Sequence, residues 1–158
     1  DRIFTNPKPE GHFKKLFPNA VAFSSFGGTP LHWTAYAADP AKTPNPPVLG
    51  YIFWTTDMVP QEHGYHGAIH ILVGLNLNGT INGVVVDYDS EPYGYFSVEP
   101  PEFAAQFKGK SIFDKFQPGA DVDFVSRATL SVNSATRAIR DSTRIVARAL
   151  LDPNAVKR

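Results

Sequence analysis

The stretch of sequence that decides the fold reads AIHILVGL (68–75), NLNGT (76–80) and INGVVVDY (81–88). Both outer runs are rich in β-branched and apolar residues, as strands are. Asn78-Gly79 between them suits a tight hairpin turn, because glycine tolerates the positive φ that such turns demand. The stretch therefore predicts two antiparallel strands, Ala68–Leu75 and Ile81–Tyr88.

The residues before this hairpin predict short elements separated by prolines. Aromatic and β-branched residues indicate a strand in Val48–Thr55, after a loop over Lys42–Pro47. Further upstream we expect a short helix at Gly11–Leu16 and short strands at Ala20–Ser25 and Leu31–Ala38.

The residues after the hairpin predict helices. Pro101–Phe107 begins with a proline at a position that helices allow, and Ser111–Phe113 predicts a helical turn. Asp121–Val125 is predicted to be extended. Leu130–Leu151 predicts a long helix, whose apolar residues recur at spacings of three and four: Val132, Ala135, Ile139, Val146, Ala149 and Leu150. Strands followed by helices, without βαβ alternation, predict one α+β domain over residues 1–158, with a mostly antiparallel sheet and a long C-terminal helix.

The composition excludes several classes of protein. The chain has 158 residues, and its 15 Lys and Arg balance 15 Asp and Glu, so it lacks the basic excess of a nucleic-acid binder. It has no cysteine, which excludes thiol chemistry and thiolate metal sites. No apolar run approaches the roughly 20 residues of a membrane span. We therefore expect a soluble piece of a larger protein.

A cluster of hydroxyls precedes the long helix. Asp123-Phe124-Val125-Ser126-Arg127-Ala128-Thr129-Leu130-Ser131 places three hydroxyls and an arginine where an extended segment turns into a helix. Free backbone N–H groups and the helix dipole make a helix start a natural phosphate site. The same pattern also fits a plain N-cap formed by Thr129 or Ser131.

The pattern Asp-x-x-Ser-Arg-Ala-Thr at 123–129 resembles the flavinylation signature of FMN-binding domains in electron-transport subunits such as RnfG and NqrC. The departure is Arg127, where that signature has glycine. The resemblance implies that Thr129 is joined to the FMN phosphate by a phosphoester bond, which an ApbE-type flavin transferase makes. It also implies that Ser126, Arg127 and the helix start hold the phosphate, and that Asp123, Ala128 and Leu130 are further cofactor-binding residues.

The resemblance extends upstream in order. The run from Gly64 to Val84 resembles the hairpin of these domains, and Ser90-Glu91-Pro92-Tyr93-Gly94 is similar to their Glu-Thr-Pro-Gly loop. This similarity implies that Glu91, Pro92, Tyr93, Gly94 and Tyr95 border the flavin ring. The resemblance covers residues 64–151. Within it, the amino-acid sequences of the hairpin and of the final arginine-rich helix are most similar to membrane-anchored proteins of the NosR/NirI and PceC type. Residues 1–50 carry no resemblance and are interpreted as an N-terminal extension.

Two other clusters have structural alternatives. His63, His66 and His70 are dense enough to suggest a metal site, but they lack a clear four-ligand set, and we predict no metal. The final helix carries Arg137, Arg140, Arg144 and Arg148 in a row. This row suits an acidic partner or lipid headgroups, but it is also typical of a solvated helix face, which we prefer.

The resemblance implies an FMN-carrying electron-transfer domain of a membrane-anchored respiratory or regulatory protein. Its expected location is periplasmic or extracytoplasmic, and its expected redox partner is membrane-embedded or holds an iron–sulfur centre. An alternative is a non-redox sensor or binding module of the same fold, with FMN loosely held or absent. A substrate-reducing flavoenzyme is a third interpretation.

Overall fold

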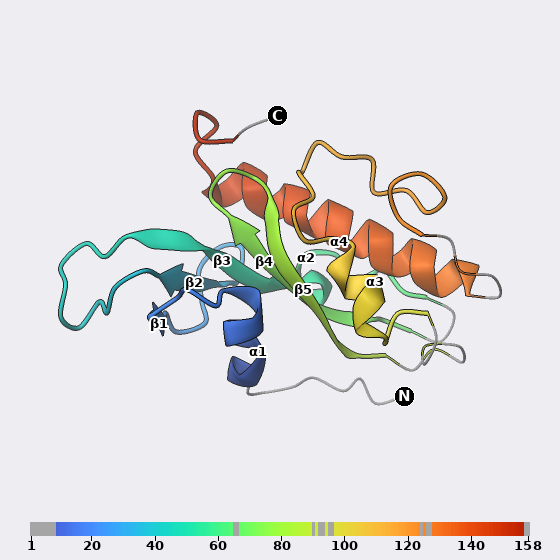
Figure 1. Cartoon of the computed structure of the whole chain (residues 1–158), viewed down its shortest axis with the longest axis horizontal. Helices are drawn as coiled ribbons and strands as arrows, with labels where there is room; N and C mark the ends of the chain where they lie inside the picture. Colours follow the sequence, from blue (N-terminus) through green and yellow to red (C-terminus); the bar gives the residue numbers. More distant parts are fainter. Residues whose placement is uncertain are drawn as a thin grey trace.

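The fold consists of a five-stranded antiparallel sheet with helices on both faces (Figure 1). The computed structural model describes residues 9–64, 67–89, 91, 94, 97–123, 125 and 128–156, except for the side chain of Tyr88. The strands follow one another in the order β1-β2-β3-β4-β5, and each pairs with the next in antiparallel fashion. Their bounds are β1 Ala22–Phe23, β2 Trp33–Tyr36, β3 Val48–Trp54, β4 His70–Asn76 and β5 Ile81–Tyr88.

Four helices accompany the sheet among the described residues. Three of them are short, and the fourth has 22 residues and runs along the sheet (Figure 1). Their bounds are α1 Glu10–Leu16, α2 Thr55–Met58, α3 Pro101–Ala105 and α4 Thr129–Leu150. The predicted α+β fold, antiparallel sheet and long C-terminal helix are confirmed.

The central strand β4 is buried on both of its faces. Ile71, Val73 and Leu75 pack into a core with α3 and α4, whereas Leu72, between them, packs into a second core with α1. Side chains alternate across a strand, so each face of β4 needs its own cover. The N-terminal segment supplies one cover and the C-terminal helices supply the other.

The N-terminal cover rests on glycines in the middle of the sheet. Gly74 of β4 and Gly83 of β5 are directly opposite in register. A Cβ built on Gly74 would lie 2.9 Å from the Phe17 ring and 3.2 Å from Leu16 Cβ, and one on Gly83 would lie 3.4 Å from Leu16. The two glycines therefore let the end of α1 approach the sheet backbone. Residues 1–50, interpreted above as an extension, contribute α1, β1, β2 and the start of β3 to the same structure.

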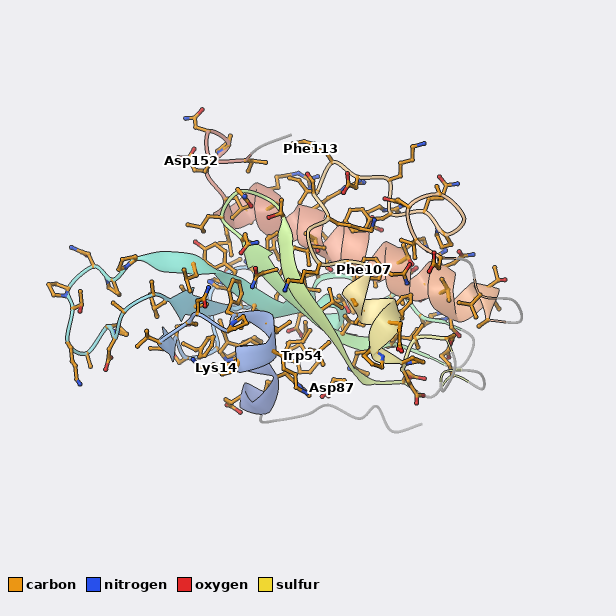
Figure 2. The ribbon with its side chains drawn as sticks, viewed as in Figure 1. Lys14, Trp54, Asp87, Phe107, Phe113 and Asp152 are labelled. Atoms are coloured by element: carbon orange, nitrogen blue, oxygen red, sulfur yellow. The ribbon has the colours of Figure 1, made fainter. Side chains whose placement is uncertain are left out.

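The second cover is the α4 layer. Val132, Ala135, Ile139 and Val146 of the predicted apolar stripe are buried against the sheet together with Phe107 and Phe116. Figure 2 labels Phe107 on this side of the sheet, and Trp54 beside α1 on the other. The predicted stripe is wrong at Ala149, which is exposed because the helical rotation of about 100° per residue turns it away from the face shared by Ile139, Val146 and Leu150.

Several predicted elements differ in extent. The predicted strands Ala20–Ser25 and Leu31–Ala38 are only two and four residues long, and Thr55 begins the unpredicted helix α2 instead of ending β3. The helix predicted at Pro101–Phe107 ends at Ala105. Ser111 forms an isolated β-bridge with Thr80 of the hairpin, and a single turn follows it. The helical turn predicted at Ser111–Phe113 is therefore a β-bridge followed by a turn.

We predict that Gly74→Ala lowers the free energy of unfolding by about 1–3 kcal/mol, because the added methyl group overpacks the α1 interface. Urea unfolding measures this change. Gly27→Ala is the matched control, since a Cβ there meets nothing within 4 Å. Equal stability of the two variants would contradict the role assigned to Gly74.

Candidate functional site

The start of α4 alternates buried and exposed side chains. The helix begins at Thr129, with Ala128 as its N-cap. Ala128 and Ser131 are buried, whereas Thr129 is exposed and Leu130 is 58% exposed. The first turn is therefore fixed to the core on one side and presents the Thr129 hydroxyl to the outside.

A buried hydrogen bond joins this turn to the segment after β5. The Ser131 hydroxyl donates to Glu91 Oε1 at 2.5 Å, and the two residues are only 3% and 7% exposed. The alternative that Ser131 caps the helix is therefore wrong. The N-cap residue is Ala128, which has no side-chain oxygen with which to accept from the first-turn N–H groups.

A third segment reaches the same place from the other side of the hairpin. A Cβ on Gly64 would overlap the Glu91 carboxylate, so the bare backbone of Gly64 makes room for that group. Two residues before it, Glu62 accepts from Arg137 Nε of α4 at 2.5 Å. The segments before β4, after β5 and at the start of α4 therefore meet at the open end of the hairpin.

The loop after β5 brings two further carboxyls together at Gly94. A Cβ on Gly94 would overlap Asp89 Oδ1 and lie 2.6 Å from Glu99 Oε2. The Gly94 carbonyl accepts from the N–H groups of Ser97 and Glu99, and its own N–H donates to the Glu91 carbonyl. The loop therefore turns at Gly94, and the carboxyls of Asp89 and Glu99 both approach that glycine.

Asp89 has a raised pKa in this loop. The pKa of Asp89 is raised to about 6, chiefly by burial and also by the nearby carboxyls of Glu99 and Glu91, against the lowering effect of the hydrogen bond from the Glu91 N–H. That N–H donates to Asp89 Oδ1 at 3.0 Å. Asp89 therefore titrates close to neutral pH, unlike an ordinary surface aspartate.

The structure places about half of the predicted site residues. Glu91 and Gly94 lie in one loop, and Glu91 contacts the turn that holds Ala128, Thr129 and Leu130. Asp123 is exposed, and its N–H donates to the Gln106 side chain after α3. The remaining predicted residues lie outside the described part of the chain: Pro92, Tyr93, Tyr95, Ser126 and Arg127.

Sequence reasoning missed the role of four residues at this site. Gly64 and Ser131 contact Glu91, whereas Asp89 and Glu99 converge at Gly94. One available signal was the acid at each end of the loop over 90–98. The partners of Glu91 had no local signal, because Ser131 follows it by 40 residues.

The histidine cluster is divided by the structure. His70 of β4 is buried, and this burial lowers its pKa, although the charge of Asp87 opposes the shift. His63 is exposed and lies against the Gly64 carbonyl, while His66 is outside the described residues. Within the described ranges, no group of three or more His, Asp or Glu side chains is arranged to hold a metal ion.

The arginine row is less solvated than predicted. Arg144 donates to the carbonyls of Ile112 and Asp114, both at 2.8 Å, and lies 5.8 Å from the centre of the Phe116 ring. Arg137 pairs with Glu62, and Arg140 pairs with Asp141. Arg137 and Arg144 therefore bind other segments to α4, and the prediction of a solvated face is wrong at Arg144.

The helix start has the chemistry that a phosphate group needs. Its first turn, Thr129 to Val132, carries no acidic residue, and the N-cap offers no competing side-chain acceptor. The N–H groups of a 22-residue helix are therefore directed at the space beside an exposed hydroxyl. These groups fit a phosphate placed on or next to Thr129.

We predict that Ser131→Ala lowers the free energy of unfolding by about 1–3 kcal/mol, because it removes a donor from a buried carboxylate. Thr129→Ala is the control, since its exposed side chain should contribute less than about 0.5 kcal/mol. Thermal and urea unfolding both measure the difference. Stability losses of the same size in the two variants would contradict the assignment of the Ser131 bond as structural.

Comparison with protein families supplies the identity of this arrangement. The model of the FMN-binding domain matches residues 64–144, just over half of the chain. The match begins at the glycine that accommodates Glu91 and includes the hairpin, the acidic loop and the start of α4. A comparison with curated proteins found no match. FMN is the cofactor of this domain, and the chain belongs to the FMN-binding domain family.

Proposed function

We propose that this domain carries FMN on Thr129 through a phosphoester bond and serves as an electron carrier. The observation that supports it most is the exposed hydroxyl of Thr129 in a helix turn whose neighbours Ala128 and Ser131 are buried. Such a turn holds the attachment oxygen in place while leaving it accessible to a modifying enzyme. The resemblance of 123–129 to the flavinylation signature gives the same residue.

Under this proposal the phosphate and the ring have separate supports. The first-turn N–H groups of α4, Ser126 and Arg127 hold the phosphate, because helix starts, hydroxyls and guanidinium groups are all donors to anions. The segment Glu91 to Tyr95 borders the ring, where aromatic faces suit a flat ligand with polar edges. FMN, when bound, supplies the redox chemistry, and the protein sets its position and potential.

The proposed covalent attachment of the cofactor favours a carrier role over a free-standing enzyme. A covalently held cofactor cannot be lost where free FMN is scarce, as in a periplasmic or extracytoplasmic compartment. The described part of the chain holds no helix that is both long enough and apolar enough to cross a membrane. The sequence resemblance to proteins of the NosR/NirI and PceC type is what supports a membrane-anchored parent, with an ApbE-type transferase and a membrane-embedded or iron–sulfur redox partner.

We predict that the domain co-produced with an ApbE-type flavin transferase gains the mass of one FMN less one water. In the phosphoester the Thr129 oxygen replaces one hydroxyl of the FMN phosphate, and the threonine proton and that phosphate hydroxyl leave, together one water. Thr129→Ala should therefore lose the adduct completely. Thr129→Ser, which keeps the hydroxyl, should retain it. Intact-mass spectrometry measures all three proteins. An adduct that persists in Thr129→Ala would exclude this attachment residue.

The carrier role requires a second measurement. The flavin absorbance of the loaded domain should disappear on reduction with dithionite and return fully on addition of ferricyanide. A protein with no flavin absorbance after co-production would instead favour the sensor module. Saturable turnover of a small electron acceptor would favour the enzyme.

A further inference from the structure

We propose that Asp89 and Glu99 share one proton and that this pair is the proton-exchange site of the domain, taking up a proton from solvent when the bound flavin is reduced. The inference rests on the proposed redox function. It concerns two residues outside the predicted flavin border.

The first step of the argument is the geometry of the two carboxyls. Both converge on the position where Gly94 lacks a side chain, since a Cβ there would overlap Asp89 Oδ1 and lie 2.6 Å from Glu99 Oε2. Two carboxyls that approach a common point this closely repel each other when both are ionised, so a state in which the pair holds one proton is favoured. The charge of Glu99 and the burial of Asp89 both favour this singly protonated state.

The second step is access to solvent. Asp89 is half-buried, whereas Glu99 is exposed. Glu99 also lines an open cavity of about 390 Å³ together with Lys15 from α1, Lys108 after α3 and residues 82–86 of β5. Glu99 is therefore the outer carboxyl of the pair, in contact with solvent, and Asp89 is the inner one.

The third step is the connection from Asp89 to the proposed cofactor turn. Asp89 Oδ1 accepts from the Glu91 N–H at 3.0 Å, and the Glu91 carboxylate accepts from Ser131 at 2.5 Å. Ser131 lies two residues after Thr129 in α4. Asp89 is therefore linked through a single residue, Glu91, to the buried hydrogen bond that holds the start of α4.

The charged groups nearest the pair come from three segments. Glu91 is on the same loop, and Lys15 of α1 and Lys108 after α3 line the same cavity as Glu99. Further along β5, Asp87 is bonded to His12 of α1 at 2.7 Å, beside α1 in Figure 2. His70 faces Asp87 from β4.

The direction of the effect follows from charge. Electrons added to a flavin near Glu91 place negative charge close to the pair, which makes the pair hold its proton more tightly. Well below pH 6 Asp89 is protonated in both redox states. Between pH 6 and the higher pKa that Asp89 has in the reduced state, reduction by two electrons is accompanied by uptake of up to one solvent proton at the pair, and oxidation by an acceptor releases it. The midpoint potential therefore falls more steeply with pH in that window than it does without the pair.

The test has one readout without flavin. Carboxyl-carbon NMR of the FMN-free domain should show Asp89 titrating near pH 6, and Glu99→Gln, which removes a charge at an exposed position, should lower that midpoint. Glu102→Gln is the matched control, because it removes an exposed carboxylate from the first turn of α3. Titration of Asp89 near pH 4 in the unmodified domain would overturn the shared proton.

The second readout uses the FMN-loaded domain. Midpoint potentials are measured from pH 5 to pH 9 with dithionite as reductant. Asp89→Asn should lose the steeper pH dependence just above pH 6, and Glu99→Gln should move its onset to lower pH, while Glu102→Gln should match the unmodified domain. Identical pH dependence in all four proteins would overturn the coupling. Absence of flavin absorbance would refute the proposed function and the coupling with it, while the NMR titration would still decide whether the pair shares a proton.

Discussion

The burial of β4 on both faces is the constraint on which the rest of this structure depends. A strand with Leu72 on one side and Ile71 and Val73 on the other cannot be left half covered, because each face would expose a row of large apolar side chains. The α4 layer covers one side only. The other requires Leu16 and Phe17, so the N-terminal segment, which carries no family resemblance, completes the core that the matched region begins.

The same constraint fixes the geometry of the site. With both faces of the hairpin held, the ends of β4 and β5 opposite the Asn78-Gly79 turn have one position relative to α4. That position allows Glu91 to lie between the bare backbone of Gly64 and the hydroxyl of Ser131. A buried carboxylate with a close-fitting neighbour on each side tolerates little displacement, since any movement removes a hydrogen bond from a buried charge. The start of α4 is therefore held firmly.

The parts of the fold encoded by neighbouring residues were predictable, and those encoded by distant ones were not. Strand β5 agrees with its prediction residue for residue, because the turn and the strand lie in one short stretch. Thr129 and Glu91 could be proposed as cofactor-site residues from local sequence motifs in the same way. The partners of those residues could not, because whether a serine caps a helix or binds a carboxylate depends on which loop the fold brings to it. The strand glycines had no local explanation either, since their use depends on Leu16.

Thr129 and Ser131 have different surroundings at the start of α4. Two residues apart on one helix, the first is exposed and the second is bonded inward. Under the proposed attachment, the helix start would hold the phosphate of FMN on the outward Thr129 side chain. The potential of the flavin would then depend on the charge of a neighbouring segment. The loop between Asp89 and Glu99 is bonded to that helix and carries three carboxyls, one of which titrates near neutral pH.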